Sequence, residues 1–237
     1  LLLLPALLAA LPLAAQKAAH LKPERSISLD IPEPSDISVA PDGKSYFIVS
    51  DNGLLFETDT EGKVIRQADY IGMDNEAVYA DDANVYTVEE AVRKLKIFDR
   101  ATLKLKRTVN LPYSGGRNKG YESFTYDAIT RHYIIITEKD PSYIYELDQD
   151  FKVVNEVNIS KLARDFSSAT FHDGFVWLLS DEDRTIFKVD PTFFEVKASW
   201  IIPIINPEGI AFDHDGNLLI QSDDMKRLYF FKNPEKQ

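Results

Sequence analysis

Residues 207–216 read Pro-Glu-Gly-Ile-Ala-Phe-Asp-His-Asp-Gly, and the pattern around this stretch recurs along the chain. A mainly apolar run at 217–221, a polar cluster at 222–224 and alternating apolar residues at 227–231 follow it. The runs are short, rich in β-branched and aromatic residues, and separated by Asp-Gly type turns, which is typical of β-hairpins. The stretch therefore predicts one antiparallel unit of a repeating protein.

The same order of segments occurs four more times. The equivalent positions, at the start of the first strand of each copy, are Ser35, Glu76, Glu122, Ser167 and Glu208. They are spaced by 41, 46, 45 and 41 residues, a period typical of propeller blades with four strands each. The last copy has only three strands, so we expect residues 25–31 to add its outer strand and to pair otherwise open edges. The predicted fold is all-β, a five-bladed β-propeller whose last blade is closed by the N-terminal strand. An open β-sandwich is the alternative, and sandwiches rarely repeat one motif five times.

The first fifteen residues carry no charge and contain Pro5 and Pro12. They are short for a membrane-spanning helix, and the small residues before Gln16 resemble a signal-peptide cleavage site. We expect a signal-peptide remnant at 1–15, a linker at 16–24 and a single propeller domain at 25–237. The expected location is periplasmic or secreted, and the alternative is anchoring in the cell membrane through an uncleaved leader.

The chain has a formal net charge of −11 and no cysteine. Disulfides and thiol chemistry are therefore excluded. Negative charge repels phosphate backbones, so we expect no nucleic-acid partner, and it favours cations or basic partners. The sequence contains no glycine-rich phosphate loop and no nucleophile elbow.

In a four-stranded blade, the loop before the first strand and the loop between the second and third strands open on the same mouth of the channel. The equivalent positions given above should therefore meet a second set, one acidic residue from each copy. This set is Asp51, Glu89, Glu138, Asp181 and Asp223. Several carboxylates around one narrow channel are costly unless they are solvated, protonated or bound to a cation.

Hard cations such as Ca²⁺ take oxygen ligands, often carboxylates and waters. We therefore interpret Glu76, Glu122 and Glu208 as metal ligands, and Ser35, Ser167 and the second set as ligand-binding residues. Two alternatives stay open: the glutamates only cap backbone amides between blades, or the second set consists of ordinary turn residues. In the loop at 113–120, Arg117 and Lys119 could meet an anionic ligand beside the metal, or the loop could simply be solvated. No histidine is expected at this mouth, which argues against histidine-based acid–base chemistry there.

The repeated segments read NEAVYA at 75–80, YESFTY at 121–126, PEGIAF at 207–212, SDISVA at 35–40 and SSATFH at 167–172. They resemble the SdiA-regulated (YjiK/CarP-like) β-propeller family. The resemblance covers roughly residues 26–232 and implies a bacterial, exported or envelope-associated protein linked with calcium homeostasis, with a suggested phytase-like activity. It departs from the family pattern at Asp36, where a glycine is common; the aspartate either adds a carboxylate or tightens the turn.

Three functions follow from these observations. The first is an envelope protein that binds calcium or a small ligand at the acidic mouth, for homeostasis or signalling. The second is a calcium-dependent hydrolase, either a phytase-like phosphoesterase or a lactonase, in which metal-bound water is the nucleophile. The third is a platform for an unknown protein partner.

Overall fold

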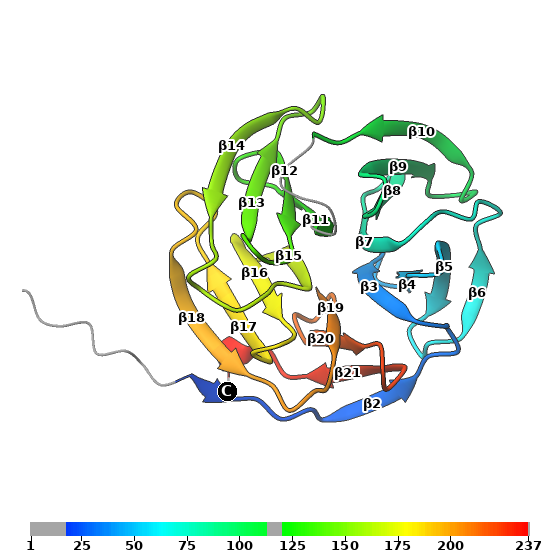
Figure 1. The fold of residues 1–237 in the computed structure, drawn as a ribbon. Helices are drawn as coiled ribbons and strands as arrows, with labels where there is room; N and C mark the ends of the chain where they lie inside the picture. The colour runs from blue at the N-terminus through cyan, green and yellow to red at the C-terminus, as the bar shows by residue number, and fades with distance from the viewer. Residues whose placement is uncertain (1–17, 113–119, 237) are drawn as a thin grey trace, which may run out of the picture.

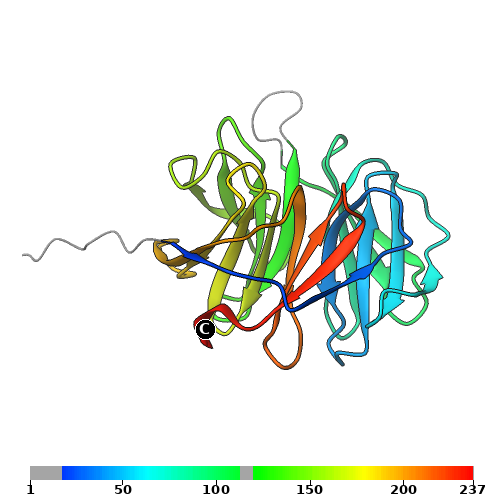
Figure 2. The ribbon, with the colours of Figure 1, turned by 90° about the horizontal axis from the view of Figure 1, so that it is seen from below.

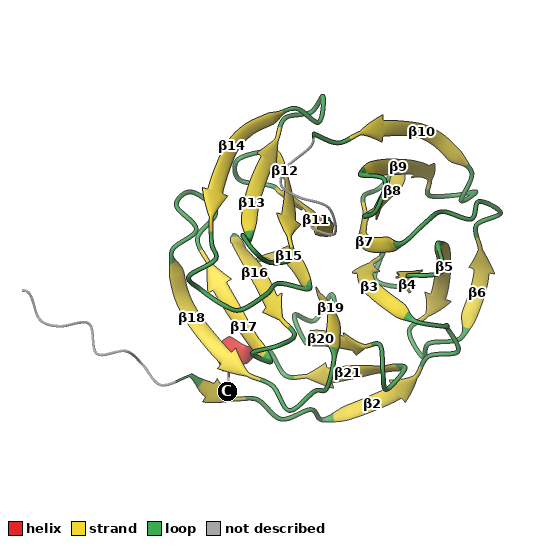
Figure 3. Cartoon of the chain, in the orientation of Figure 1, coloured by secondary structure: helices red, strands yellow, loops and turns green. Residues whose placement is uncertain are grey.

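A computed structural model of the chain describes residues 18–112 and 120–236. The expected leader at 1–15, together with Arg117 and Lys119, lies outside the described residues. The regular secondary structure of the described part consists of strands joined by loops and turns, apart from a short 3-10 turn, η1 (Pro234–Lys236), at its end (Figure 3). Among these residues, no helix has the length and apolar character needed to cross a membrane.

Five sheets stand around a central channel as the blades of a propeller (Figure 1). Blade 1 consists of β3 (Pro34–Val39), β4 (Ser45–Ser50), β5 (Leu54–Asp59) and β6 (Val64–Gln67). Blade 2 consists of β7 (Asn75–Ala80), β8 (Asn84–Glu89), β9 (Lys94–Asp99) and β10 (Leu105–Asn110). Blade 3 consists of β11 (Tyr121–Asp127), β12 (His132–Thr137), β13 (Tyr143–Leu147) and β14 (Val153–Asn158). Blade 4 consists of β15 (Ser168–His172), β16 (Phe175–Ser180), β17 (Thr185–Val189) and β18 (Val196–Ile201). Blade 5 consists of β19 (Pro207–Phe212), β20 (Leu218–Ser222), β21 (Arg227–Phe231) and, from the N-terminal region, β2 (Arg25–Ser28).

The predicted closure of the ring is confirmed. Strand β2 pairs antiparallel with β21, with Ile27 opposite Leu228. The segment expected as a linker at 16–24 also contains a two-residue strand, β1 (Ala19–His20), which pairs in parallel with β18. Leu21 follows it, is 4% exposed and packs with Trp177 in the core between blades 4 and 5. The outer edges of blades 4 and 5 therefore both pair with strands of the N-terminal segment (Figure 2).

The core lies between the blades. Five apolar clusters each combine residues of two neighbouring blades. The second strands are buried on both faces, which is why they read as nearly continuous apolar runs such as 133–136 rather than as an alternating pattern. At the boundary between blades 4 and 5, the fully buried Trp177 ring lies 4.8 Å from that of Phe212, from centroid to centroid. Burial of such rings supplies much of the stability of this fold.

Polar side chains on the inner strands join neighbouring blades and also join blades 4 and 1, which are not neighbours in the ring. The Val78 N–H donates to Asp36 Oδ2 at 2.8 Å, and the Ile210 N–H donates to Ser168 Oγ at 3.2 Å. The Ser168 hydroxyl in turn donates to Asp36 Oδ1 at 2.8 Å, so that one hydrogen-bonded chain links blades 5, 4, 1 and 2. Blade 5 has Gly209 at the repeat position that Asp36 occupies in blade 1. A Cβ atom on Gly209 would lie 3.0 Å from the side chain of Ile37, so there is little room for a larger residue. The carboxyl of Asp36 is thus part of the channel wall.

Candidate metal site at the channel mouth

The loops before the inner strands and the loops between second and third strands open on one face, as the repeat pattern predicts. A cavity of about 680 Å³ lies at this mouth. Ten acidic residues line it: Asp51, Asp74, Glu76, Glu90, Glu122, Glu138, Asp165, Asp181, Glu208 and Asp223. Ser35, Ser167 and Arg93 also line it. The structure therefore places in one cavity all five residues of the first predicted set and four of the second.

Glu89 is the exception, because it does not line the cavity; Glu90, the next residue, does. Strand β8 ends at Glu89, which occupies the position of Ser50 at the end of β4. The side chain of Glu89 is buried away from the cavity, where it accepts a hydrogen bond from the Tyr70 hydroxyl at 2.8 Å and pairs with Lys96 Nζ at 3.4 Å. Two glutamates follow each other here, so the sequence alone does not decide which of them is the blade 2 member of the second set. The difference matters because side chains of adjacent strand residues point to opposite faces.

The tightest group of acidic residues in the described chain consists of Asp74, Glu76 and Glu90. One carboxylate oxygen from each lies within 4.8 Å of the other two. Asp74 is placed by a left-handed backbone conformation, with φ of 57°, just before β7. Its carbonyl accepts the Glu90 N–H at 2.9 Å, which holds the two loops together. Asp74 lies two residues before Glu76, at a position that recurs as Glu33 before Ser35 and Asn206 before Glu208, with the same left-handed backbone and the same hydrogen bond to the next loop. Extending the repeat by two residues before each strand start would have included it.

The three glutamates predicted as metal ligands do not form this group together. Glu76 belongs to it, and Glu122 shares a hydrogen bond with Glu90 at its edge. Glu208 lies on blade 5, where the acidic residues that act most on it are Asp181 and Asp223. The mouth therefore contains one compact group on blade 2 and further carboxylates around it.

Burial and mutual repulsion make these carboxyls hard to ionise. Burial, followed by the charges of Asp51 and Asp74, raises the pKa of Glu76 to about 10. Burial, followed by Asp181, raises the pKa of Glu208 to about 8. Burial also raises the pKa of Glu122 well above its usual range, with the charge of Glu76 as the next cause. Without a cation, the mouth must hold protons near neutral pH, and a bound cation would release them.

The two serines of the first set have structural partners. The Ser35 hydroxyl donates to the carbonyl of Asn75, and the Ser167 hydroxyl donates to that of Pro207 at 2.7 Å. Each therefore joins its blade to the next blade in the ring. The alternative considered for the glutamates was a different contact between blades, in which a carboxylate accepts from backbone amides; the serine hydroxyls instead donate to backbone carbonyls.

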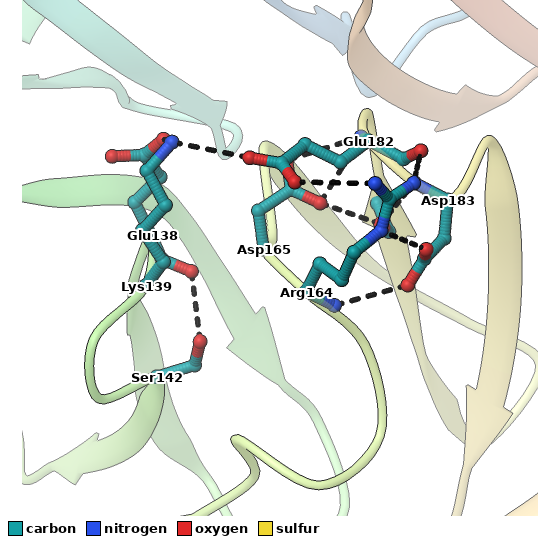
Figure 4. A network of polar contacts seen from close by, with 8 residues as sticks. Glu138, Lys139, Ser142, Arg164, Asp165, Glu182 and Asp183 are labelled. Carbon is teal, nitrogen blue, oxygen red and sulfur yellow. Dashed lines mark hydrogen bonds and ion pairs between the residues drawn. The ribbon is translucent and has the colours of Figure 1, made fainter.

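Over blades 3 and 4, acidic residues near the mouth form ion pairs with basic ones (Figure 4). Lys139 Nζ lies 2.6 Å from Glu138 Oε1 and 3.4 Å from Glu182 Oε1. Arg164 Nε lies 2.5 Å from Asp183 Oδ1. Asp165, which the sequence analysis missed, accepts the Ser180 hydroxyl at 2.6 Å and so supports the loop that carries this network.

Histidines lie away from the cavity, as expected. His172 and His214 lie at the turns of the opposite face; His172 stacks on Phe212 with 4.0 Å between ring centroids. His132 Nδ1 lies 3.2 Å from Glu146 Oε1 between neighbouring strands of blade 3.

The residues at the mouth fit a hard divalent cation. All the charged donors of the compact group are carboxylate oxygens, and neither histidine nor cysteine is among them. Ca²⁺ accepts six to eight oxygen ligands in irregular geometry, with waters completing the shell. Three carboxylates with further acidic side chains nearby meet that requirement better than they meet the nitrogen and sulfur preferences of Zn²⁺.

Comparison with known proteins agrees with the fold. A crystal structure of glutaminyl cyclase from Myxococcus xanthus is similar, with a TM-score of 0.72 and 13% sequence identity over 91% of this chain and 97% of the other. At this identity the similarity shows the propeller fold alone. The family model described as SdiA-regulated matches residues 16–232. The chain therefore belongs to the SdiA-regulated family.

Proposed function

We propose that this protein is an exported β-propeller that binds Ca²⁺ at the acidic mouth of its channel. The observation that carries the proposal is the approach of carboxylate oxygens from Asp74, Glu76 and Glu90 to within 4.8 Å of one another. Three carboxylates at this separation repel one another, and a divalent cation turns that repulsion into attraction.

The surroundings of the group support the same function. The charges that act on Glu76 come from other carboxylates, Asp51 foremost. The net charge of −11 adds a negative field that draws cations to the mouth. A role in calcium homeostasis or signalling at the cell envelope is part of the proposal, supported by the family resemblance and by the apolar stretch at 1–15.

Thermal unfolding tests the proposal. The protein is treated with EDTA, dialysed, and unfolded with Ca²⁺ or Mg²⁺ added in steps. A cation that binds only the folded state raises the unfolding midpoint as its concentration rises. We expect a rise that is larger for Ca²⁺ and absent in Glu76→Gln, while the exposed Glu156→Gln behaves as the unmodified protein. The absence of any shift at millimolar Ca²⁺ would contradict the proposal and direct attention to the protein-platform alternative.

A calcium-dependent hydrolase is a second proposal, favoured by one observation. Two carboxyls at the mouth have pKa values near neutrality: burial, then Asp223, raises that of Asp51 to about 6, and Glu208 titrates at about 8. Groups that exchange protons near the working pH suit general acid–base catalysis. Release of phosphate from phytate, or opening of a lactone, with and without Ca²⁺, tests this. Activity that is lost in Glu208→Gln and kept in Glu156→Gln would support an enzyme, and no turnover of either substrate would contradict it.

A further inference from the structure

The outer strand of blade 2 lies in a segment that is rich in positive charge. Residues 93–107 contain seven of the 27 lysines and arginines in the chain and a single acidic residue, Asp99. Three of the basic residues, Lys104, Lys106 and Arg107, lie on or directly before β10, and all three are exposed. In a chain with a net charge of −11, this local reversal of sign attracts acidic partners.

Neutral groups hold these side chains without neutralising them. Lys106 Nζ donates to Asn84 Oδ1 at 2.8 Å, and the Arg107 guanidinium lies 5.7 Å from the centroid of the Phe151 ring. Neither of them, nor Lys104, forms an ion pair within the part of the chain that the structure describes. The charges are therefore partly fixed in place and still open to a partner.

The backbone edge of β10 is open as well. The strand is the last in its sheet, and no described residue pairs with its outer side (Figure 1). On its inner side, the Leu111 N–H donates to the carbonyl of Arg93 at 2.9 Å, and the pairing with β9 is regular from Arg107 onward. Inward and outward backbone groups alternate along an antiparallel strand, so the N–H and C=O groups of Thr108 and Asn110 point outward. Such a row of unpaired donors and acceptors is a template for an added strand.

The molecule already adds a strand at the same place on another blade. On blade 4, β1 pairs in parallel with the outer strand β18, and the Leu21 N–H donates to the carbonyl of Ile201 at 2.9 Å. The remaining outer strands fit a partner less well, because β2 and β6 have four residues each and β14 carries Glu156 and no basic residue. Strand β10 thus combines a six-residue open edge with charges that no acidic residue offsets.

We propose that the outer edge of β10 binds an extended, acidic segment of another protein, which adds a fifth strand to blade 2. Backbone hydrogen bonds would hold the segment, and its acidic side chains would lie beside Lys106 and Arg107. Lysines on an edge strand also keep two copies of a chain from pairing, so the same charges disfavour a second copy of this basic edge. The inference goes beyond the cation site and does not depend on it, because no residue of β10 lines the cavity.

Fluorescence anisotropy with labelled six-residue peptides tests the inference. The probe alternates glutamate and valine; the controls replace glutamate by glutamine, replace it by lysine, or methylate the backbone nitrogens of the glutamate peptide. We expect the glutamate peptide to bind about tenfold or more tightly than the glutamine peptide at low salt, with an advantage that shrinks as salt is added. The lysine peptide and the methylated peptide should bind at least tenfold more weakly than the glutamate peptide. Hydrogen exchange should slow at the amides of Thr108 and Asn110 when the peptide binds, and stay unchanged in β14.

Two variants separate the backbone from the charges. Thr108→Pro removes an outward N–H and keeps the bonds to β9, a position where edge strands tolerate proline; it should abolish binding at an unchanged unfolding midpoint. Lys106→Glu combined with Arg107→Glu should remove the preference for glutamate over glutamine.

Several results would overturn the inference. They are equal affinity for the glutamate and glutamine peptides, equal affinity for the methylated and unmethylated peptides, and protection on another strand. The methylated peptide decides the matter if Thr108→Pro lowers the unfolding midpoint. Dimerisation of the peptide-free protein in sedimentation runs, lost in Thr108→Pro, would assign the edge to a second copy and overturn the inference too.

Discussion

Replacement of Glu208 by glutamine should stabilise the cation-free protein, by an amount that grows with pH. Glutamine keeps the size and polarity of the side chain and removes its ability to ionise. The folded state raises the pKa of Glu208 from an ordinary value of 4.5 to about 8, through burial and then the charge of Asp181. The protein therefore holds this carboxyl in a place that opposes its charged form.

The sign follows from proton linkage. A carboxyl whose pKa is raised by folding binds its proton more tightly in the folded state. The resulting stability is fully present below pH 4.5 and is lost as the pH rises through about 8. At pH 7 the loss is roughly 3 kcal/mol, at 1.36 kcal/mol for each of about 2.5 pH units. Solvent near the mouth screens part of this repulsion, so this magnitude is an upper bound. Glu208→Gln removes the loss, and its advantage should be near zero at pH 4.5 and largest near pH 8.

Urea unfolding in EDTA at pH 5 and at pH 7.5 measures the effect, with Glu156→Gln on the exposed strand β14 as the matched control. The expected result is a free energy of unfolding that favours Glu208→Gln more at pH 7.5 than at pH 5, and no pH-dependent difference for the control. An equal change at both pH values, or a variant less stable at pH 7.5, would refute the reasoning. It would mean that Glu208 serves the fold rather than a ligand.

Three further predictions concern other parts of the molecule. Asp36→Ala leaves two buried donors without an acceptor and should lower the free energy of unfolding by about 2–5 kcal/mol in urea titrations; a change under 0.5 kcal/mol would show that the channel wall does not need this carboxyl. Glu90→Gln should weaken Ca²⁺ binding by at least tenfold in isothermal titration, whereas Glu89→Gln should lower the unfolding midpoint and leave Ca²⁺ affinity intact; the reverse result would move the site to Glu89. Leu21→Ala should cost about 2–4 kcal/mol in chemical unfolding, because this residue is buried at 4% exposure beside blade 4; an unchanged stability would show that β1 contributes nothing to the fold.

The fold could be predicted because the information for it is repeated. Each copy carries the same order of short strands and turns, so errors in one copy are corrected by the others. The closing strand β2 was predictable, because the last copy lacks a fourth strand of its own. Strand β1 was not, because its two residues, Ala19 and His20, have no strand pattern and pair only where β18 offers an edge.

The site was predictable to the level of the mouth and not to the level of the ligands. Positions repeated in every copy, such as Glu76 and Glu208, could be read from the spacing. Asp74 lies two residues before Glu76, outside the strand-start positions that were compared, although Glu33 and Asn206 occupy the same place in blades 1 and 5. Glu90 was displaced by one residue in the prediction, because only the hydrogen-bond register of β8 decides which of two adjacent glutamates faces the cavity.

The central claim is that a cation binds between Asp74, Glu76 and Glu90, and a crystal structure of the protein grown with Ca²⁺ tests it most directly. The account predicts an ion at about 2.3–2.6 Å from oxygens of all three carboxylates, with waters completing its shell. Anomalous scattering from a lanthanide soaked into the same crystals should mark the same position. An ion bound elsewhere, or no ion at the mouth at millimolar Ca²⁺, would contradict the account.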